Sequence, residues 1–304
     1  MAYPVNSGGG VPSLSGTFIP ELWSTKLIEK LYDATVYEEI ANTDYEGEIK
    51  KHGDKVIIRT VPTLTIRDYV KGQNLQYENP TAPNVELLID QGHYFAFNCY
   101  DIDKYQSDLN LMSEWAADGA EQMKIKVDTN ILGTIFTRAH AQNAGATAGR
   151  KSGNINLGTA ATPLAVTKAN VSDVIVDYGT VLDEQNVPES GRYLIIPARM
   201  AGLIKKSELK DASITGDGTS MLRNGRLGMI DRFTIYVSNN VSASAGKHNI
   251  IFGQKKALTF AAQATNMETL KNPNDFGDLI RSLMIYGYEV IDPKALGHSV
   301  VTLG

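Results

Sequence analysis

The sequence predicts an α+β protein, and three patterns along the chain support that fold class. Residues 107–141 contain no proline and place apolar side chains at the three- and four-residue steps of an amphipathic helix. Residues from 55 onward, and again from 278 onward, instead alternate apolar and polar side chains, which is typical of strands. Between them, residues 165–265 mix helical and strand patterns over a length that is normal for a domain.

The composition belongs to a folded chain with a substantial core. Its 304 residues are 42% hydrophobic and 21% charged, which excludes intrinsic disorder. No apolar run approaches the roughly 18 residues of a membrane-spanning helix, and the single cysteine, Cys99, excludes an internal disulfide framework. A net charge of -5 provides no global field that would attract nucleic acid.

The N-terminal part predicts an arm and then a ribbon. Residues 1–20 are rich in glycine and proline, which favours an extended arm, and residues 21–41 follow with a helical pattern. Strand patterning runs from Lys55 to Asp68, with return strands expected over 85–90 and 93–102. A two-stranded ribbon is marginal by itself in water. Since no partner sheet is evident nearby in the sequence, we expect it to lie on another molecule.

The remaining elements follow in order. The helix over 107–141 would be roughly 50 Å long, enough to form the spine of an elongated subunit. Asn170 is expected to cap a second helix, and Pro197 to end a buried strand over 193–196. The other expected elements are a helix over 200–209, strands over 233–237 and 250–252, and a closing strand pattern over 278–303.

No segment carries a convincing catalytic, cofactor or metal motif. Residues 145–153 resemble a phosphate loop, but Arg150 precedes the lysine and the segment follows a helix instead of a strand. The five histidines lack the spacing of a metal pair, and Asp101 with Asp103 has no third ligand. Cys99 is expected to be a buried thiol. The sequence therefore predicts no enzyme, no cofactor and no metal.

Charged residues along the ribbon allow two interpretations. Arg59, Arg67 and Lys71 either lie on solvated faces or form ion pairs between subunits with acidic neighbours such as Asp68 and Glu78. With apolar residues of the ribbon and the arm, they make up the candidate subunit interface: Phe18, Trp23, Arg59, Leu64, Ile66, Arg67, Asp68, Lys71 and Glu78.

Taken together, several sequence segments and their order along the chain resemble the tailed-bacteriophage major capsid protein family, which has the Hong Kong 97-like fold. The resemblance extends from about residue 18 to residue 303. The segments on which the resemblance rests are FIPELWSTKLIEKL, GDKVIIRTVP, VDTNIL, NVPESGRYLIIPA, LRNGRLGMIDRFTIYVSNN, GQKKALTFAAQ and DFGDLIRSLMIYGYEVIDPKAL.

This resemblance implies a division of the chain. Residues 1–44 would be an N-terminal arm and 45–106 an extended β-hairpin loop that crosses a neighbouring subunit. Residues 107–164 with 266–304 would form a peripheral domain built on the spine helix, and 165–265 an axial α/β domain. The covalent lysine–asparagine crosslink of some family members is not assignable here, although Lys71, Asn74 and Asn79 lie near the ribbon tip.

The resemblance also implies a function and partners. The chain would be the coat protein of a tailed double-stranded DNA phage, assembling with itself into pentamers and hexamers of an icosahedral shell in the host bacterial cytoplasm. The shell would contact packaged DNA non-specifically, and a portal and optionally a decoration protein would join it. Because the sequence enters the arm directly after Met1, we expect a separate scaffolding protein, or none, and no proteolytic maturation.

Two other functions are compatible with the sequence. Encapsulin nanocompartments share the fold but enclose enzymes instead of a genome. A cytosolic α+β enzyme, with a site around Asp211, Asp217 and Arg223, is a weaker alternative because no acid–base pair has a spacing that chemistry demands.

Overall fold

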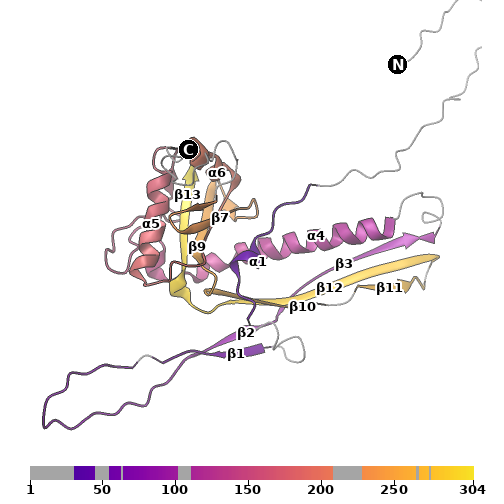
Figure 1. Ribbon diagram of the computed structural model, residues 1–304. Helices are drawn as coiled ribbons and strands as arrows, with labels where there is room; N and C mark the ends of the chain where they lie inside the picture. The colour runs from indigo at the N-terminus through magenta and orange to yellow at the C-terminus, as the bar shows by residue number, and fades with distance from the viewer. Residues whose placement is uncertain are drawn as a thin grey trace, which may run out of the picture.

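In the computed structural model, the described residues form three β-sheets, one each of two, four and seven strands (Figure 1). The structure describes residues 31–44, 55–62, 64–101, 111–207, 228–264, 267–273 and 275–304. The seven-stranded sheet and its helices form a globular unit at one end, and the four-stranded sheet extends away from it beneath a long helix (Figure 1). Among the described helices, none is long and apolar enough to cross a membrane.

The seven-stranded sheet has the order β4-β13-β9-β5-β7-β6, with β8 paired to β9. Helix α5 covers it, and its predicted apolar stripe is confirmed: Val171, Val174, Ile175, Tyr178 and Leu182 are all buried, and Tyr178 stacks on Phe252. The bounds are β4 Leu164–Val166, α5 Val171–Glu184, β5 Arg192–Ile196, α6 Ala198–Lys206, β6 Met229–Ile230, β7 Phe233–Val237, β8 Ala243–Ser244, β9 Lys247–Gln254 and β13 Leu296–Leu303.

One capping prediction is wrong. Asn170 occupies the N-cap position of α5, but its side chain makes no capping hydrogen bond to that helix. Its Oδ1 instead accepts a hydrogen bond from the backbone N–H of Thr167 at 2.7 Å, and its Nδ2 donates to the carbonyl of Ala165. The amide therefore closes the turn before the helix, a local competition that is common for asparagine.

The four-stranded sheet consists of β3 (Gln91–Tyr100), β10 (Leu258–Ala264), β11 (Glu268–Lys271) and β12 (Gly277–Val290). β12 is its centre, with β3 on one side and β10 and β11 on the other. Helix α4 (Leu111–Leu132) lies along β3, where Phe97 meets Trp115 edge-on (Figure 1).

The long helix ends earlier than the sequence predicts. Its last residue is Leu132, and its 22 described residues span about 33 Å. Gly133 follows it, and the short 3-10 helices η1 (Ile135–Arg138) and η2 (Ala141–Asn143) replace the predicted continuation to 141. Glycine weakens a helix by about 1 kcal/mol, and the Thr134 hydroxyl donates back to the carbonyl of Asn130, which favours an end at this point. The expected caps, Ser107 and Asn110, lie outside the described residues.

The ribbon is also shorter than predicted. β1 (Lys55–Arg59) pairs antiparallel with β2 (Asn84–Leu88), and the ladder stops at the Arg59–Asn84 pair. Beyond this pair, toward the tip of the ribbon, Pro62 lies after β1 and Pro83 immediately before β2, and neither has an N–H to donate. A strand forms close to the second expected return strand, 93–102, but its expected partner is wrong: β3 (Gln91–Tyr100) pairs with β12 and not with the ribbon.

The C-terminal strand pattern divides between two sheets. β12 ends at Val290, and η4 (Pro293–Ala295) turns the chain before β13 begins at Leu296. β13 then pairs with β9 and β4 of the seven-stranded sheet. The expected division, with 266–304 in one peripheral domain, therefore does not follow the sheets: residues 296–303 join the globular unit. The helix α1 (Tyr37–Ile40) packs near α4 at the junction of the two units.

Candidate subunit interface

The base of the ribbon is fixed to its own subunit. Ile58 of β1 and Leu87 of β2 form a small buried cluster with Ala261 of β10, and a Cβ atom at Gly287 of β12 would overlap the carbonyl of Leu88. Lys55 and Glu86 form an exposed ion pair across the strands at 3.5 Å. The expectation that no internal surface supports the ribbon is therefore wrong for its base, which the four-stranded sheet holds.

Beyond Arg59 the ribbon continues as an extended loop, and its described residues, 60–62 and 64–83, form no ladder of their own. Among its described residues, one hydrogen bond joins backbone to backbone, from the N–H of Gln73 to the carbonyl of Val70, at a turn where Gly72 has a φ of 89°. Side chains hold the two halves together instead. Glu78 accepts a hydrogen bond from the N–H of Thr65 at 2.7 Å, and this bond lowers the pKa of its carboxyl group.

Arg67 and Glu78 interact within this loop. Their charged groups lie 4.0 Å apart, and Arg67 also donates a hydrogen bond to Gln76. These contacts pair two of the candidate charges inside one chain. An exposed pair of this kind contributes little to stability, and here it links the two halves of the loop.

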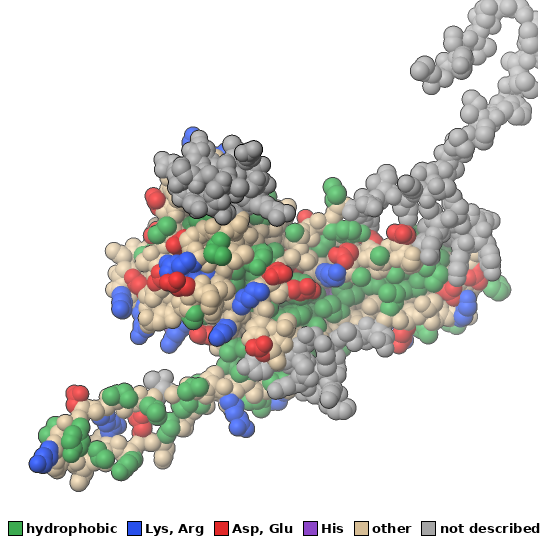
Figure 2. Space-filling view, in the orientation of Figure 1, with side chains coloured by type: hydrophobic (Ala, Val, Ile, Leu, Met, Phe, Trp, Pro, Cys, Tyr) green, Lys and Arg blue, Asp and Glu red, His purple; other side chains and the backbone are tan. Residues whose placement is uncertain are grey.

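Large apolar side chains on the loop have no partner in the described part of the chain. The exposed fractions are 92% for Val61, 91% for Ile66, 90% for Tyr77 and 73% for Tyr69. Figure 2 shows hydrophobic side chains along the ribbon out to its free end. A row of exposed apolar groups on a projecting element is typical of a surface that another molecule covers.

The structure places most of the predicted interface residues on this loop. Leu64, Asp68 and Lys71 are exposed there, and Arg59 is exposed at the end of β1. Phe18 and Trp23 lie outside the described residues. The prediction missed Tyr69 and Tyr77, although two tyrosines flanking a polar turn were the signal that could have found them.

Asp128 of α4 also escaped the sequence analysis, and it joins three parts of the chain. Its buried carboxylate accepts hydrogen bonds from the N–H groups of Val36 and Tyr37, at 3.0 and 2.9 Å, and from Nδ2 of Asn240 at 2.8 Å. Burial raises the pKa of this carboxyl group, and the hydrogen bonds oppose the shift. In the sequence, a charged residue next to Val127 in an otherwise apolar helical stripe could have indicated a buried carboxylate.

The segments with a weak resemblance to chemical sites make structural contacts within the chain. In the segment resembling a phosphate loop, the N–H groups of Lys151 and Ser152 donate to the carboxylate of Glu184, at 2.7 and 3.1 Å, and these bonds lower its pKa. That carboxylate occupies the donors that a phosphate would need. Cys99 is buried, as predicted. Within the described residues no cluster of three metal-ligating side chains exists, and Asp103, Asp211, Asp217 and Arg223 lie outside them.

Comparison with known proteins gives concordant matches. A model of a phage capsid protein family matches residues 95–298. A solved structure from Mycobacterium phage Che8 is similar with a TM-score of 0.78 at 27% identity, covering 92% of this chain and 96% of that one. The capsid of cyanophage P-SCSP1u gives a TM-score of 0.69 at 15% identity, covering 94% and 93% of the two chains. The capsid of a native GTA particle gives 0.66 at 16% identity, covering 96% and 98%. Among curated proteins, no match was found.

Proposed function

The chain belongs to the phage capsid protein family, and from that premise we propose how its parts build a shell. It is the major capsid protein of a tailed phage, a structural protein that assembles with copies of itself into the capsid of the virion. The observation that carries the proposed mechanism is the ribbon, which combines a base fixed to its own subunit with exposed apolar side chains at its free end.

We assign the parts of the shell subunit as follows. The seven-stranded unit is the axial domain, which meets its copies around the symmetry axes. The four-stranded sheet with α4 is the peripheral domain, and residues 55–90 are the extended loop that crosses a neighbour. The exposed Leu64, Ile66 and Tyr77 support this assignment, because burying each such side chain contributes about 2 kcal/mol.

A contact of this kind would account for the formation of a ring. A ribbon that projects from one face and lies on a different face of the next subunit is a heterologous interface, and such interfaces close into rings when the rotation permits. Pentamers and hexamers then differ only in small rotations between identical subunits. Around this shell we propose a separate scaffolding protein, a portal, non-specific contacts with packaged DNA and assembly in the host cytoplasm. A decoration protein is an optional further partner.

A double substitution tests the role of the ribbon. Replacing Leu64 and Ile66 by Asp removes apolar contact and adds charge, so we expect folded subunits whose yield of shells falls at least about tenfold. Electron microscopy and sedimentation of the purified protein measure the yield. The control is Gln73→Asp with Asn74→Asp, which adds the same charge at polar positions of the same ribbon. Shells at wild-type yield from the Leu64 and Ile66 variant would contradict the proposal.

A further inference from the structure

Residues 34–42, which we call the strap, cross the junction between the peripheral and axial domains. The strap contains α1, which lies where α4 reaches the globular unit (Figure 1). Its C-terminal half is bound to β10 of the peripheral domain. The backbone of Asn42 donates to the carbonyl of Leu258 at 2.8 Å and accepts from the N–H of Phe260 at 3.0 Å. The ring of Tyr37 packs on that of Phe260, with 5.0 Å between the centroids.

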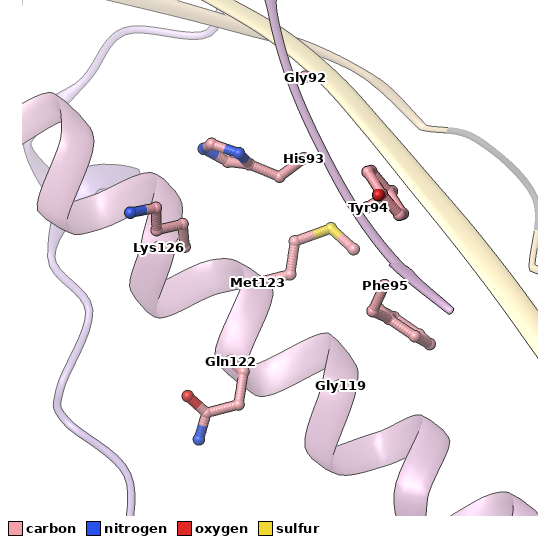
Figure 3. A pocket seen from close by; sticks show the side chains of 8 residues that line it. All are labelled: Gly92, His93, Tyr94, Phe95, Gly119, Gln122, Met123 and Lys126. Atoms are coloured by element: carbon pink, nitrogen blue, oxygen red, sulfur yellow. The ribbon is translucent and has the colours of Figure 1, made fainter. Parts of the chain in front are cut away.

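Asp128 of α4 holds the first part of the strap on the same domain. Its Oδ1 accepts hydrogen bonds from the N–H groups of both Val36 and Tyr37, at 3.0 and 2.9 Å. Another side of α4 faces the four-stranded sheet, and Met123 projects from it toward β3 (Figure 3). The strap and α4 therefore form one body with the peripheral domain.

The axial domain contacts this body through the segment that follows β7. The second carboxylate oxygen of Asp128, Oδ2, accepts a hydrogen bond from Nδ2 of Asn240 at 2.8 Å. The hydroxyl of Ser238 donates to the carbonyl of Ala34 in the strap at 3.2 Å. A single carboxylate thus joins the strap, α4 and the axial domain.

The packing beneath these hydrogen bonds is apolar. Ile40 of the strap, Ile131 of α4 and Ile195 of β5 are fully buried in one continuous core. Apolar contacts have no preferred direction, so such a junction tolerates small rotations of one domain on the other. A hydrogen bond to a charged group is directional and about twice as strong as one between neutral groups. The bond between Asn240 and Asp128 is therefore suited to select one angle between the domains.

We propose that Asn240 and Asp128 form a releasable latch that sets the angle between the axial and peripheral domains. While the bond is made, the axial domain is held against the strap in the observed position. When the bond breaks, the axial domain rotates about the junction and the strap stays on the peripheral domain. A subunit that fits both pentamers and hexamers needs freedom of this kind, and this role in a shell rests on the proposed function. The latch itself is a property of the free subunit.

Exchanging the two side chains tests the latch. Asn240→Asp places two carboxylates in contact, and their repulsion should break the bond. Adding Asp128→Asn should restore it. The new amide oxygen can accept the N–H groups of Val36 and Tyr37, and the new amide nitrogen can donate to the new carboxylate.

The distance between spin labels on the two domains of the free subunit measures the angle by pulsed EPR. The labels are placed at Gln122→Cys on α4 and Thr180→Cys on α5, in a Cys99→Ser background. Both positions are exposed, and Gln122 points away from β3 (Figure 3). We expect Asn240→Asp to broaden the distance distribution at least about twofold, and the exchanged pair to return it to within about 1.3-fold of the wild type. Asn239→Asp adds the same charge at the exposed neighbouring residue and should keep the wild-type width.

Hydrogen exchange separates release of the latch from melting of the junction. In Asn240→Asp the amides of Val36 and Tyr37 should keep their protection within about threefold of the wild type, because the strap stays on α4. Three results would overturn the inference: a wild-type width in Asn240→Asp, an exchanged pair that stays broad while melting like the wild type, or loss of protection at these two amides. Shell formation plays no part in these measurements, so a wild-type protein that forms no shells would overturn the proposed function alone.

Discussion

Asp128 shows how one side chain fixes the relation between distant segments. The residue before α1, the first residue of α1 and the loop after β7 all donate hydrogen bonds to its carboxylate. Asp128→Ala leaves these donors buried and unpaired, so we expect the free energy of unfolding to fall by about 2–3 kcal/mol. Urea denaturation of the free subunit measures this change. The exposed neighbour Thr129→Ala is the control, expected within about 0.5 kcal/mol of the wild type; an equally small effect at Asp128 would refute its anchoring role.

His298 should make the stability of the subunit depend on pH. Burial against the ring of Phe136 lowers its pKa from 6.5 to about 4, and its Nε2 lies 3.0 Å from Oδ1 of Asn249. The unfolded chain therefore binds a proton more readily than the folded one. The contribution of neutral His298 to the free energy of unfolding is complete above pH 6.5. It is lost as the pH falls toward 4, by up to about 3 kcal/mol.

Comparing the wild type with His298→Gln isolates this effect, because other groups titrate equally in both proteins. Denaturation at pH 7 and pH 4.5 should show a larger loss of stability in the wild type than in the variant. Equal losses in the two proteins would mean that His298 is as accessible to protons when folded as when unfolded.

At the scale of elements, the sequence predicts well what depends on local periodicity. The stripe of α5 and the buried strand β5 follow from their own residues, and both predictions are confirmed. The partner of β3 does not follow, because alternation reveals which residues share a face and not which strand lies alongside. β13 is assigned to the wrong unit for the same reason: the turn at Pro293 sends it to a different sheet.

The interface residues divide in a similar way. Leu64 and Ile66 stand out from the sequence because they belong to an alternating strand pattern for which no partner sheet is evident nearby. Arg67 and Glu78 allowed contacts within or between subunits, and only the fold brings them together in one chain. Asp128 is visible in the sequence as a charge in an apolar stripe, but its donors come from segments about a hundred residues away in the chain.

At the scale of the whole molecule, β12 connects the functional parts. It pairs with β3, β10 and β11 along its length, and Gly287 lies against the ribbon base at Leu88. The direction in which the ribbon leaves its subunit is therefore set by a contact between backbones. Such a contact requires glycine because any side chain would separate the two segments.

This close contact allows a substitution at Gly287 to test whether assembly depends on the direction in which the ribbon leaves its subunit. In Gly287→Ala the added methyl group overlaps the carbonyl of Leu88, so the ribbon base must move away from β12. We expect a loss of about 1–3 kcal/mol in subunit stability, together with a fall in shell yield that persists where the variant is fully folded. Gly202→Ala on α6, where an added Cβ meets nothing within 4 Å, is the matched control and should assemble normally. If Gly287→Ala loses stability but still forms wild-type shells, the reach of the loop beyond Arg59, and not the orientation of its base, determines where the ribbon lies on the neighbouring subunit.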